Sequence, residues 1–203
     1  MMKLFLSLIL ILIALPLYAN PCMQMLMGGT TGTAAPPAAC TTQTTPSDME
    51  TSAFEYTWVG QDSSTKYIAS KFVADADTGT VCRICLSLNK INSPTMDFSV
   101  QIWGDTGGRP NPADVKDDYG SMNAANIAGT FGDCFSLGSV ALIDGTTYHI
   151  VIVADTYNAT NYFRWIRDSS CTTEVIARSA DGSTWYDVKT DQCGMAKLYE
   201  VTP

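Results

Sequence analysis

The sequence is poor in the residues on which most enzyme active sites rely. Its 203 residues include a single histidine, His149, and four glutamates: Glu50, Glu55, Glu174 and Glu200. Neither G-x-S-x-G nor H-E-x-x-H occurs, so serine-hydrolase and zinc-protease chemistry have no sequence support. Glu174 and Glu200 fall on expected strands and leave a glycosidase pair as a minor alternative. We expect no catalytic residues and a protein that is not an enzyme.

Positive charge and long apolar runs are also scarce. Twelve Lys and Arg residues stand against 20 Asp and Glu residues, which gives a formal net charge of −8 at pH 7. An acidic surface repels phosphate backbones, so a nucleic-acid partner is disfavoured. After residue 19, no apolar run reaches the roughly 18 residues that a membrane helix needs. We therefore expect no membrane span beyond the N-terminal leader.

The N-terminus is the one strongly apolar segment. Lys3 precedes a run over residues 4–15 that only Ser7 interrupts, and Ala19 supplies a small residue for cleavage. Such a run reaches only about 18 Å as a helix, short of the roughly 30 Å hydrocarbon core of a bilayer. The pattern is typical of a secretory signal peptide. We expect residues 1–19 to be removed and the protein to be secreted, periplasmic or at the cell surface.

Cysteine is abundant for an exported chain, and in that compartment it indicates disulfides. The seven candidates are Cys22, Cys40, Cys82, Cys85, Cys134, Cys171 and Cys193. Because seven is odd, at least one cysteine stays free or pairs between chains. We expect Cys171 to bond Cys193, which would close a hairpin around Trp185, and Cys22 to bond Cys40.

Cys82 and Cys85 form a C-x-x-C motif. A zinc site needs about four ligands and a thioredoxin-like site needs a helix start, and the sequence offers neither. On an extended strand the two side chains point to opposite faces about 10 Å apart, beyond the roughly 7 Å limit for a disulfide. We expect each to bond a different partner.

The chain divides at about residue 50. Residues 20–50 are rich in Thr, Pro and Gly, cannot bury enough apolar area to offset chain entropy, and are expected to form a tether. Residues 51–203 alternate short apolar segments with turns, without an amphipathic helix. This pattern predicts an all-β, two-sheet antiparallel β-sandwich. Strands are expected at residues 67–73, 84–88, 98–103, 134–143, 148–154, 162–166, 174–178, 184–188 and 196–201.

Residues 104–132 are expected to form a long connection between strands. Loops longer than about 15 residues are uncommon unless they are functional. This segment is therefore where we expect features specific to this protein.

Several motifs occur in a characteristic order: LSLNKINSPT at 86–95, a strand at 98–103, GGRP at 107–110, LIDGTTYHIV at 142–151 and DGSTW at 181–185. The series resembles the choice-of-anchor type β-sandwich domains of bacterial exported and surface proteins. The resemblance covers about residues 66–199. It implies a jelly-roll-like sandwich related in shape to carbohydrate-binding modules, and it implies no catalytic residues.

Sugar-binding proteins stack pyranose faces on flat aromatic rings, and six rings are candidates: Trp58, Trp103, Tyr162, Trp165, Trp185 and Tyr186. Trp165 shares parity with Phe163 and suits the core, whereas Trp185 follows a turn resembling a shortened Asp-box and suits packing on the sheet. Trp103 lies on the polar face of its strand and enters the long connection. We predict that Trp103, Asp105 and Arg109 border a glycan site.

No cofactor and no metal ligands are expected. A structural calcium is an open alternative, because the loop at residues 75–79 carries two aspartates and residues 105–118 carry four more. Neither segment has the full carboxylate set of an EF-hand. The predicted function is a non-catalytic binding or adhesion module with carbohydrate as the leading ligand class. The alternatives are a structural subunit of an extracellular assembly and a glycan-active enzyme.

Overall fold

The computed structural model describes residues 40–43, 55–75, 79–136, 138–168, 171 and 175–201. The predicted signal peptide, nearly all of the predicted tether and Cys22 lie outside these residues. The helical segments of the described chain are two 3-10 turns, η3 (Ser63–Thr65) and η4 (Ala124–Asn126). Within this part of the chain, no helix has the length and apolar character to cross a membrane.

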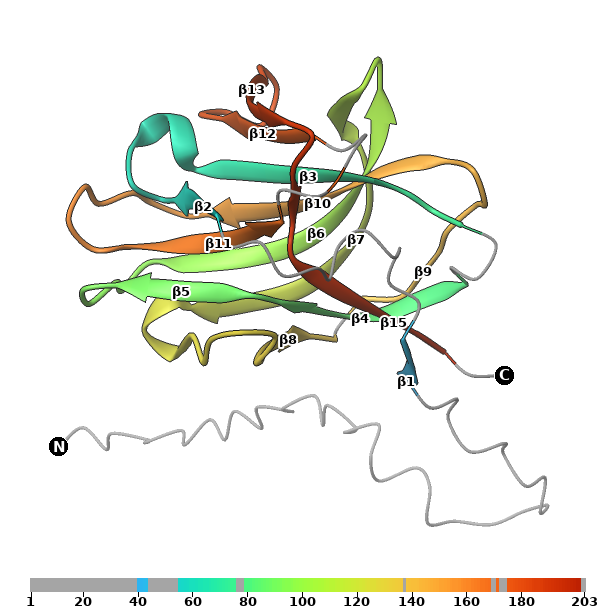
Figure 1. The fold of residues 1–203 in the computed structure, drawn as a ribbon, viewed down its shortest axis with the longest axis horizontal. Coiled ribbons are helices and arrows are strands. Elements are labelled where there is room, and N and C mark those ends of the chain that lie inside the picture. The colour runs from blue at the N-terminus through green and yellow to red at the C-terminus, as the bar shows by residue number, and fades with distance from the viewer. Residues whose placement is uncertain are drawn as a thin grey trace, which may run out of the picture. The chain divides into compact units, whose positions relative to one another are not determined.

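One layer of the domain is a six-stranded antiparallel sheet in the order β13-β12-β3-β10-β6-β7. In that order its strands are Tyr186–Thr190, Val175–Ser179, Tyr67–Val73, Thr147–Ala154, Asp97–Thr106 and Arg109–Asn123. Strand β10 sits in the middle, because its nearly continuous apolar sequence suits burial on both faces. Figure 1 shows β3, β10, β6 and β7 following one another across the layer.

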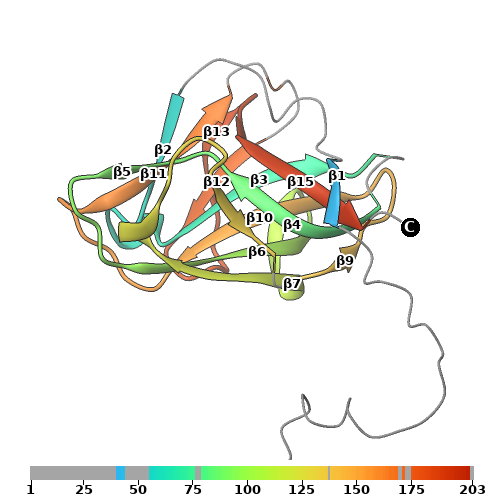
Figure 2. The ribbon, with the colours of Figure 1, turned by 90° about the horizontal axis from the view of Figure 1, so that it is seen from below.

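The other layer is split into two hydrogen-bonded sheets. One has the order β1-β15-β4-β8 with β9 on β4, and the other has the order β14-β11-β2 with β5 on β11. Figure 2 places β6 and β7 on one side of the domain and β2, β11 and β15 on the other. The strands are Cys40–Gln43 (β1), Glu55–Val59 (β2), Thr80–Leu86 (β4), Leu88–Ile91 (β5), Asp133–Phe135 (β8), Val140–Ala141 (β9), Tyr162–Asp168 (β11), Cys193–Gly194 (β14) and Ala196–Val201 (β15).

The split occurs where two strands are each interrupted by one residue. Ser87 separates β4 from β5, and Met195 separates β14 from β15. At this point the Ser87 amide donates to the Met195 carbonyl (3.2 Å), the Met195 amide to the Ile166 carbonyl (2.8 Å) and the Ile166 amide to the Ser87 carbonyl (2.9 Å). Strand β11 therefore enters between the two interrupted strands without leaving these backbone groups unpaired.

The main core lies between the layers and follows the two-residue period of the strands. Phe98 of β6 contacts Phe163 of β11 with ring centroids 4.5 Å apart. Trp165, two residues after Phe163, is fully buried and donates from Nε1 to the Met195 carbonyl (3.0 Å). A Cβ at Gly194 would overlap the Trp165 ring, so glycine is required there for the ring to approach the backbone. The expected core position of Trp165 is confirmed, and so is the all-β antiparallel sandwich.

The expected long connection at residues 104–132 is wrong. Most of it is the 15-residue strand β7, which pairs with β6 in a hairpin. Strand β7 is an edge strand, and edge strands tolerate charges and proline because one side faces water. Three register shifts along the β6–β7 pair also break the two-residue period. These two features gave a strand the sequence appearance of a loop.

Three disulfides join the described cysteines: Cys40–Cys82, Cys85–Cys134 and Cys171–Cys193. The different partners of Cys82 and Cys85 and the Cys171–Cys193 bond are confirmed. The predicted Cys22–Cys40 bond is wrong. Strand β1 pairs with β15, which pairs with β4, and this order brings the Cα of Cys40 within 6.0 Å of the Cα of Cys82. Three disulfides fit an extracellular or surface location.

Candidate functional site

Trp103 of β6 does not present a ring to solvent, contrary to the prediction. It lies on the face of the six-stranded sheet opposite the main core, as its parity predicts, but is only 5% exposed. Trp185 meets it edge-on, with centroids 6.0 Å apart and planes at 90°, and Tyr67 lies 6.4 Å away. Its Nε1 donates to Gln101 Oε1 (2.7 Å). A second small apolar cluster therefore covers this ring.

The turn between β12 and β13 holds Trp185 over the sheet. Asp181 Oδ1 accepts from the amides of Ser183 (2.8 Å) and Thr184 (2.9 Å), and these bonds hold the pKa of Asp181 well below its usual range. Trp185 Nε1 donates to the Gly182 carbonyl (2.9 Å), and Gly182 adopts a positive φ of 76° that glycine tolerates. The predicted hairpin turn with Trp185 on the sheet is confirmed.

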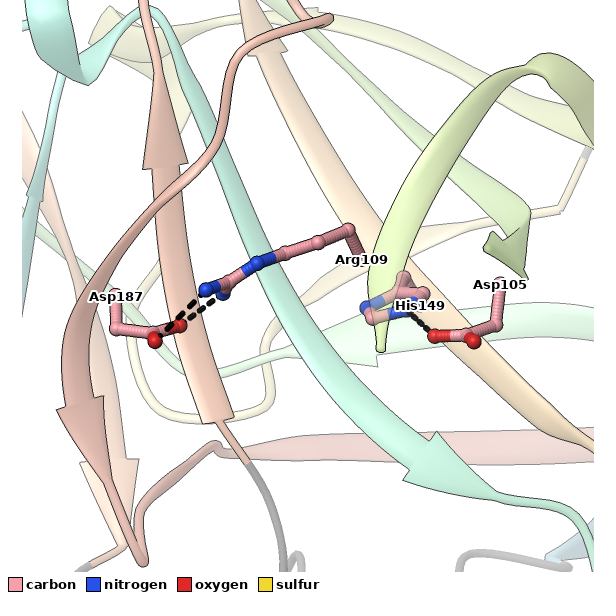
Figure 3. Close-up of polar contacts among 4 residues, drawn as sticks. All are labelled: Asp105, Arg109, His149 and Asp187. Carbon is pink, nitrogen blue, oxygen red and sulfur yellow. Dashed lines mark hydrogen bonds and ion pairs between the residues drawn. The ribbon is translucent and has the colours of Figure 1, made fainter. Parts of the chain in front are cut away.

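The other two predicted site residues are engaged in ion pairs near the same end of the sheet. Figure 3 shows Arg109 reaching Asp187 of β13, and His149 of β10 beside Asp105 of β6. The Arg109–Asp187 pair is bidentate. Arg109 and Asp105 thus already have protein partners. Their role at a glycan site stays a prediction.

His149 is 2% exposed, and its Nε2 lies 2.8 Å from Asp105 Oδ1. Burial lowers the pKa of His149, while the contact with Asp105 opposes that shift. Sequence reasoning missed this pair because its members are far apart in the chain and meet only through the β10–β6 register.

Replacing Trp103 with alanine is expected to lower the free energy of unfolding by about 2 kcal/mol, below the cost for a core aromatic, because its cluster is small. Urea unfolding measures this loss, and Tyr186→Ala, an exposed aromatic on β13, is the control. Glycan affinity should stay unchanged. Lost affinity at an unchanged unfolding midpoint would instead support a direct contact between Trp103 and sugar.

Exposed aromatic rings are found on the other layer. Strand β2 alternates strictly, with Tyr56 40% exposed and Trp58 47% exposed, while Thr57 and Val59 are buried. The two rings therefore stand on one face of a strand, about 7 Å apart along it. Trp58 was one of the six candidate rings, whereas Tyr56 was missed. Five residue pairs with β11 fix the strand beneath them.

Two arginines of β11 flank these rings. Arg164 is directly opposite Trp58, and its Cζ lies 5.1 Å from the centroid of the Tyr56 ring. Arg167 is opposite Glu55 and forms an ion pair with it, Nη2 to Oε2 3.0 Å. Burial lowers the pKa of Arg167, and Glu55 opposes that shift. We call Tyr56, Trp58, Arg164 and Arg167 the β2 surface.

Two hollows adjoin the β2 surface. One, of about 310 Å³, is lined by Glu55, Tyr56, Trp58, Arg164 and Arg167. The other, of about 170 Å³, lies between β2 and the β12–β13 hairpin, and its lining adds Thr57, Thr65, Ile68, Arg178, Val188 and Lys189. A pocket of about 340 Å³ also lies beside Asp105, but its one aromatic residue, Tyr148, is buried. The β2 surface thus combines hollows with exposed rings.

Among the described residues, no group of three His, Cys, Asp or Glu side chains converges on a point where a metal could bind. Asp105 pairs with His149, and Asp114 pairs with Lys116 at 2.7 Å. Residues 76–78 and Glu174 lie outside the described residues. The calcium alternative at that loop and the Glu174–Glu200 pair therefore stay predictions.

No family model matches this sequence, and no curated protein matches it. Among solved structures, it is similar to the cysteine protease and lectin-like domains of Cwp84, a surface layer associated protein of Clostridium difficile. That match has 11% identity and a TM-score of 0.49, and covers 69% of this chain and 33% of that one. A clostridial cysteine protease after propeptide cleavage matches with 10% identity and a TM-score of 0.50, covering 73% of this chain and 38% of that one. The chain thus spans less than two-fifths of either protein, and at such identity the likeness shows the fold alone.

Proposed function

We propose that this protein is an exported, non-catalytic binding module that takes carbohydrate on the β2 surface. The observation that carries the proposal is the pair of exposed rings, Tyr56 and Trp58, on one face of a paired strand. Large aromatic rings are usually buried, because leaving them in water forgoes their hydrophobic stabilisation. A rigid strand that nevertheless exposes two of them provides a platform with little ordering entropy to lose on binding.

The chemistry of a sugar suits this surface. The C–H faces of a pyranose stack on an aromatic ring, while its hydroxyls need polar partners at the rim. Arg164, Arg167 and Glu55 supply donors and acceptors next to the rings. Glu55 is the single carboxylate in the lining of the two hollows and is already paired with Arg167, whereas glycosidases use two carboxylates across the bond. This arrangement supports binding rather than hydrolysis.

Replacing Trp58 with alanine is expected to weaken glycan binding roughly 5- to 150-fold. This range converts about 1–3 kcal/mol for one stacked ring, by analogy with base–aromatic stacking. A glycan array first selects a ligand for the wild-type protein, and titration calorimetry then compares Trp58→Ala and Tyr56→Ala. Tyr157→Ala is the control, since Tyr157 is exposed but lines neither hollow. A wild-type protein that binds no glycan, or a Trp58→Ala protein that binds at wild-type strength, would reject the proposal.

A further inference from the structure

The charge around the β2 surface is opposite to that of the whole chain. The sequence has 20 acidic and 12 basic residues. The lining of the two adjoining hollows nevertheless contains four basic residues, Arg164, Arg167, Arg178 and Lys189, against one acidic residue, Glu55. A third of the chain's basic residues thus gather around two exposed rings.

Most of this positive charge has no carboxylate partner. The ion pairs of the described residues include one member of the group, Arg167, which is bound to Glu55. Arg164 contacts the Tyr56 ring, which leaves its charge uncancelled. Arg178 and Lys189 form no ion pair within the described part of the chain. Three cations are therefore available to a ligand at this site.

The arrangement of rings and cations favours one class of ligand. Directly opposed residues on neighbouring antiparallel strands hold their Cβ atoms about 5 Å apart. A sugar stacked on Trp58 therefore has Arg164 beside it, across the strand pair. A guanidinium matches the two oxygens of a carboxylate or sulfate with paired hydrogen bonds, and such charge-assisted bonds are about twice as strong as neutral ones.

We infer that the β2 surface selects anionic glycans, in which carboxylate or sulfate groups on the sugar bind Arg164 and its neighbouring cations while the ring stacks on Trp58. This inference rests on the proposed carbohydrate-binding function. The protein's overall negative charge repels such a polymer only weakly at physiological ionic strength, because the Debye length is about 8 Å there. The cations that contact the ligand act at shorter range than that.

The test compares three defined polymers by titration calorimetry: polygalacturonate, dextran sulfate and neutral dextran. The wild-type protein is expected to bind at least one of the anionic polymers more tightly than dextran, and less tightly in 0.5 M NaCl than in 0.05 M. Comparing polygalacturonate with dextran sulfate separates the carboxylate from the sulfate as the recognised group. Arg164→Gln is expected to weaken anionic binding roughly tenfold or more, as the loss of a charge-assisted hydrogen bond predicts.

Two further variants separate recognition from general effects of charge or folding. Lys189→Gln, on the exposed face of β13, should also weaken anionic binding, and an exposed position leaves folding intact. Lys116→Gln, a cation of β7 outside both hollows, should leave it unchanged. Trp58→Ala should weaken binding of every glycan that the protein binds.

Each contrary outcome has a distinct meaning. Preference for a neutral glycan, or wild-type anionic binding by Arg164→Gln, would overturn this inference and leave the proposed function standing. Anionic binding that Trp58→Ala does not weaken would overturn the inference as well, because it would reflect charge without stacking. Failure to bind any glycan would overturn both.

Discussion

Truncation of Trp165 to alanine is expected to lower the free energy of unfolding by about 3–5 kcal/mol, the usual range for deleting a core aromatic. The ring is fully buried and its Nε1 holds the Met195 carbonyl where the split layer divides. Deletion would open a cavity over Gly194 and leave that buried carbonyl without its indole donor. Urea unfolding gives the loss as a lower midpoint at an unchanged slope.

The matched control for this prediction is Trp58→Ala. The two tryptophans are of the same type and lie on the paired strands β11 and β2, but Trp58 is half-exposed. Its truncation should change stability by less than about 1 kcal/mol. Equal losses in the two variants would show that burial does not determine the cost, and would contradict the core described above.

The regular strands could be predicted from the sequence because one face of each meets the core. The bounds of β3 (Tyr67–Val73) and β15 (Ala196–Val201) coincide with the predicted segments. Strand β7 could not be predicted in this way. Its charged residues face water along the sheet edge, and the bulges that fit it to β6 remove the two-residue period.

The candidate site shows a different limit of sequence reasoning. Parity placed Trp103 on the outer face of its strand correctly, but parity does not show what covers that face. The cover is Trp185, which the β12–β13 turn brings from 82 positions further along the chain. For β2 the usual rule fails, since Tyr56 and Trp58 face water while Thr57 faces inward. The alternation was visible in the sequence, but it did not show which half was buried.

Disulfide pairing divides along the same line. The spacing of Cys82 and Cys85 was enough to separate their partners, because a strand turns residues three apart to opposite faces. The Cys171–Cys193 bond is local to the segment around Trp185. Cys40 was assigned to its nearest neighbour in sequence, whereas β1 pairs with β15 near the opposite end of the chain.

Replacing both Cys85 and Cys134 with alanine is expected to cost about 4 kcal/mol, from the loop entropy that a bond between residues 49 positions apart removes from the unfolded chain. Strand β8 has three residues and pairs only with β4 among the described strands. The bond therefore also holds Phe135, which packs on Phe98 with centroids 5.7 Å apart. Urea unfolding of the double variant measures the loss.

The Cys171→Ala/Cys193→Ala protein is the comparison for that variant. Its bond spans 22 residues, so the same entropy predicts a loss of about 3 kcal/mol. A thiol reductant should lower the wild-type midpoint further than either double variant, because it opens all three bonds. In each variant the reductant should still act, since two bonds remain. If the Cys85→Ala/Cys134→Ala midpoint equals that of the wild type, β8 is held by its packing and the entropic account of this bond is wrong.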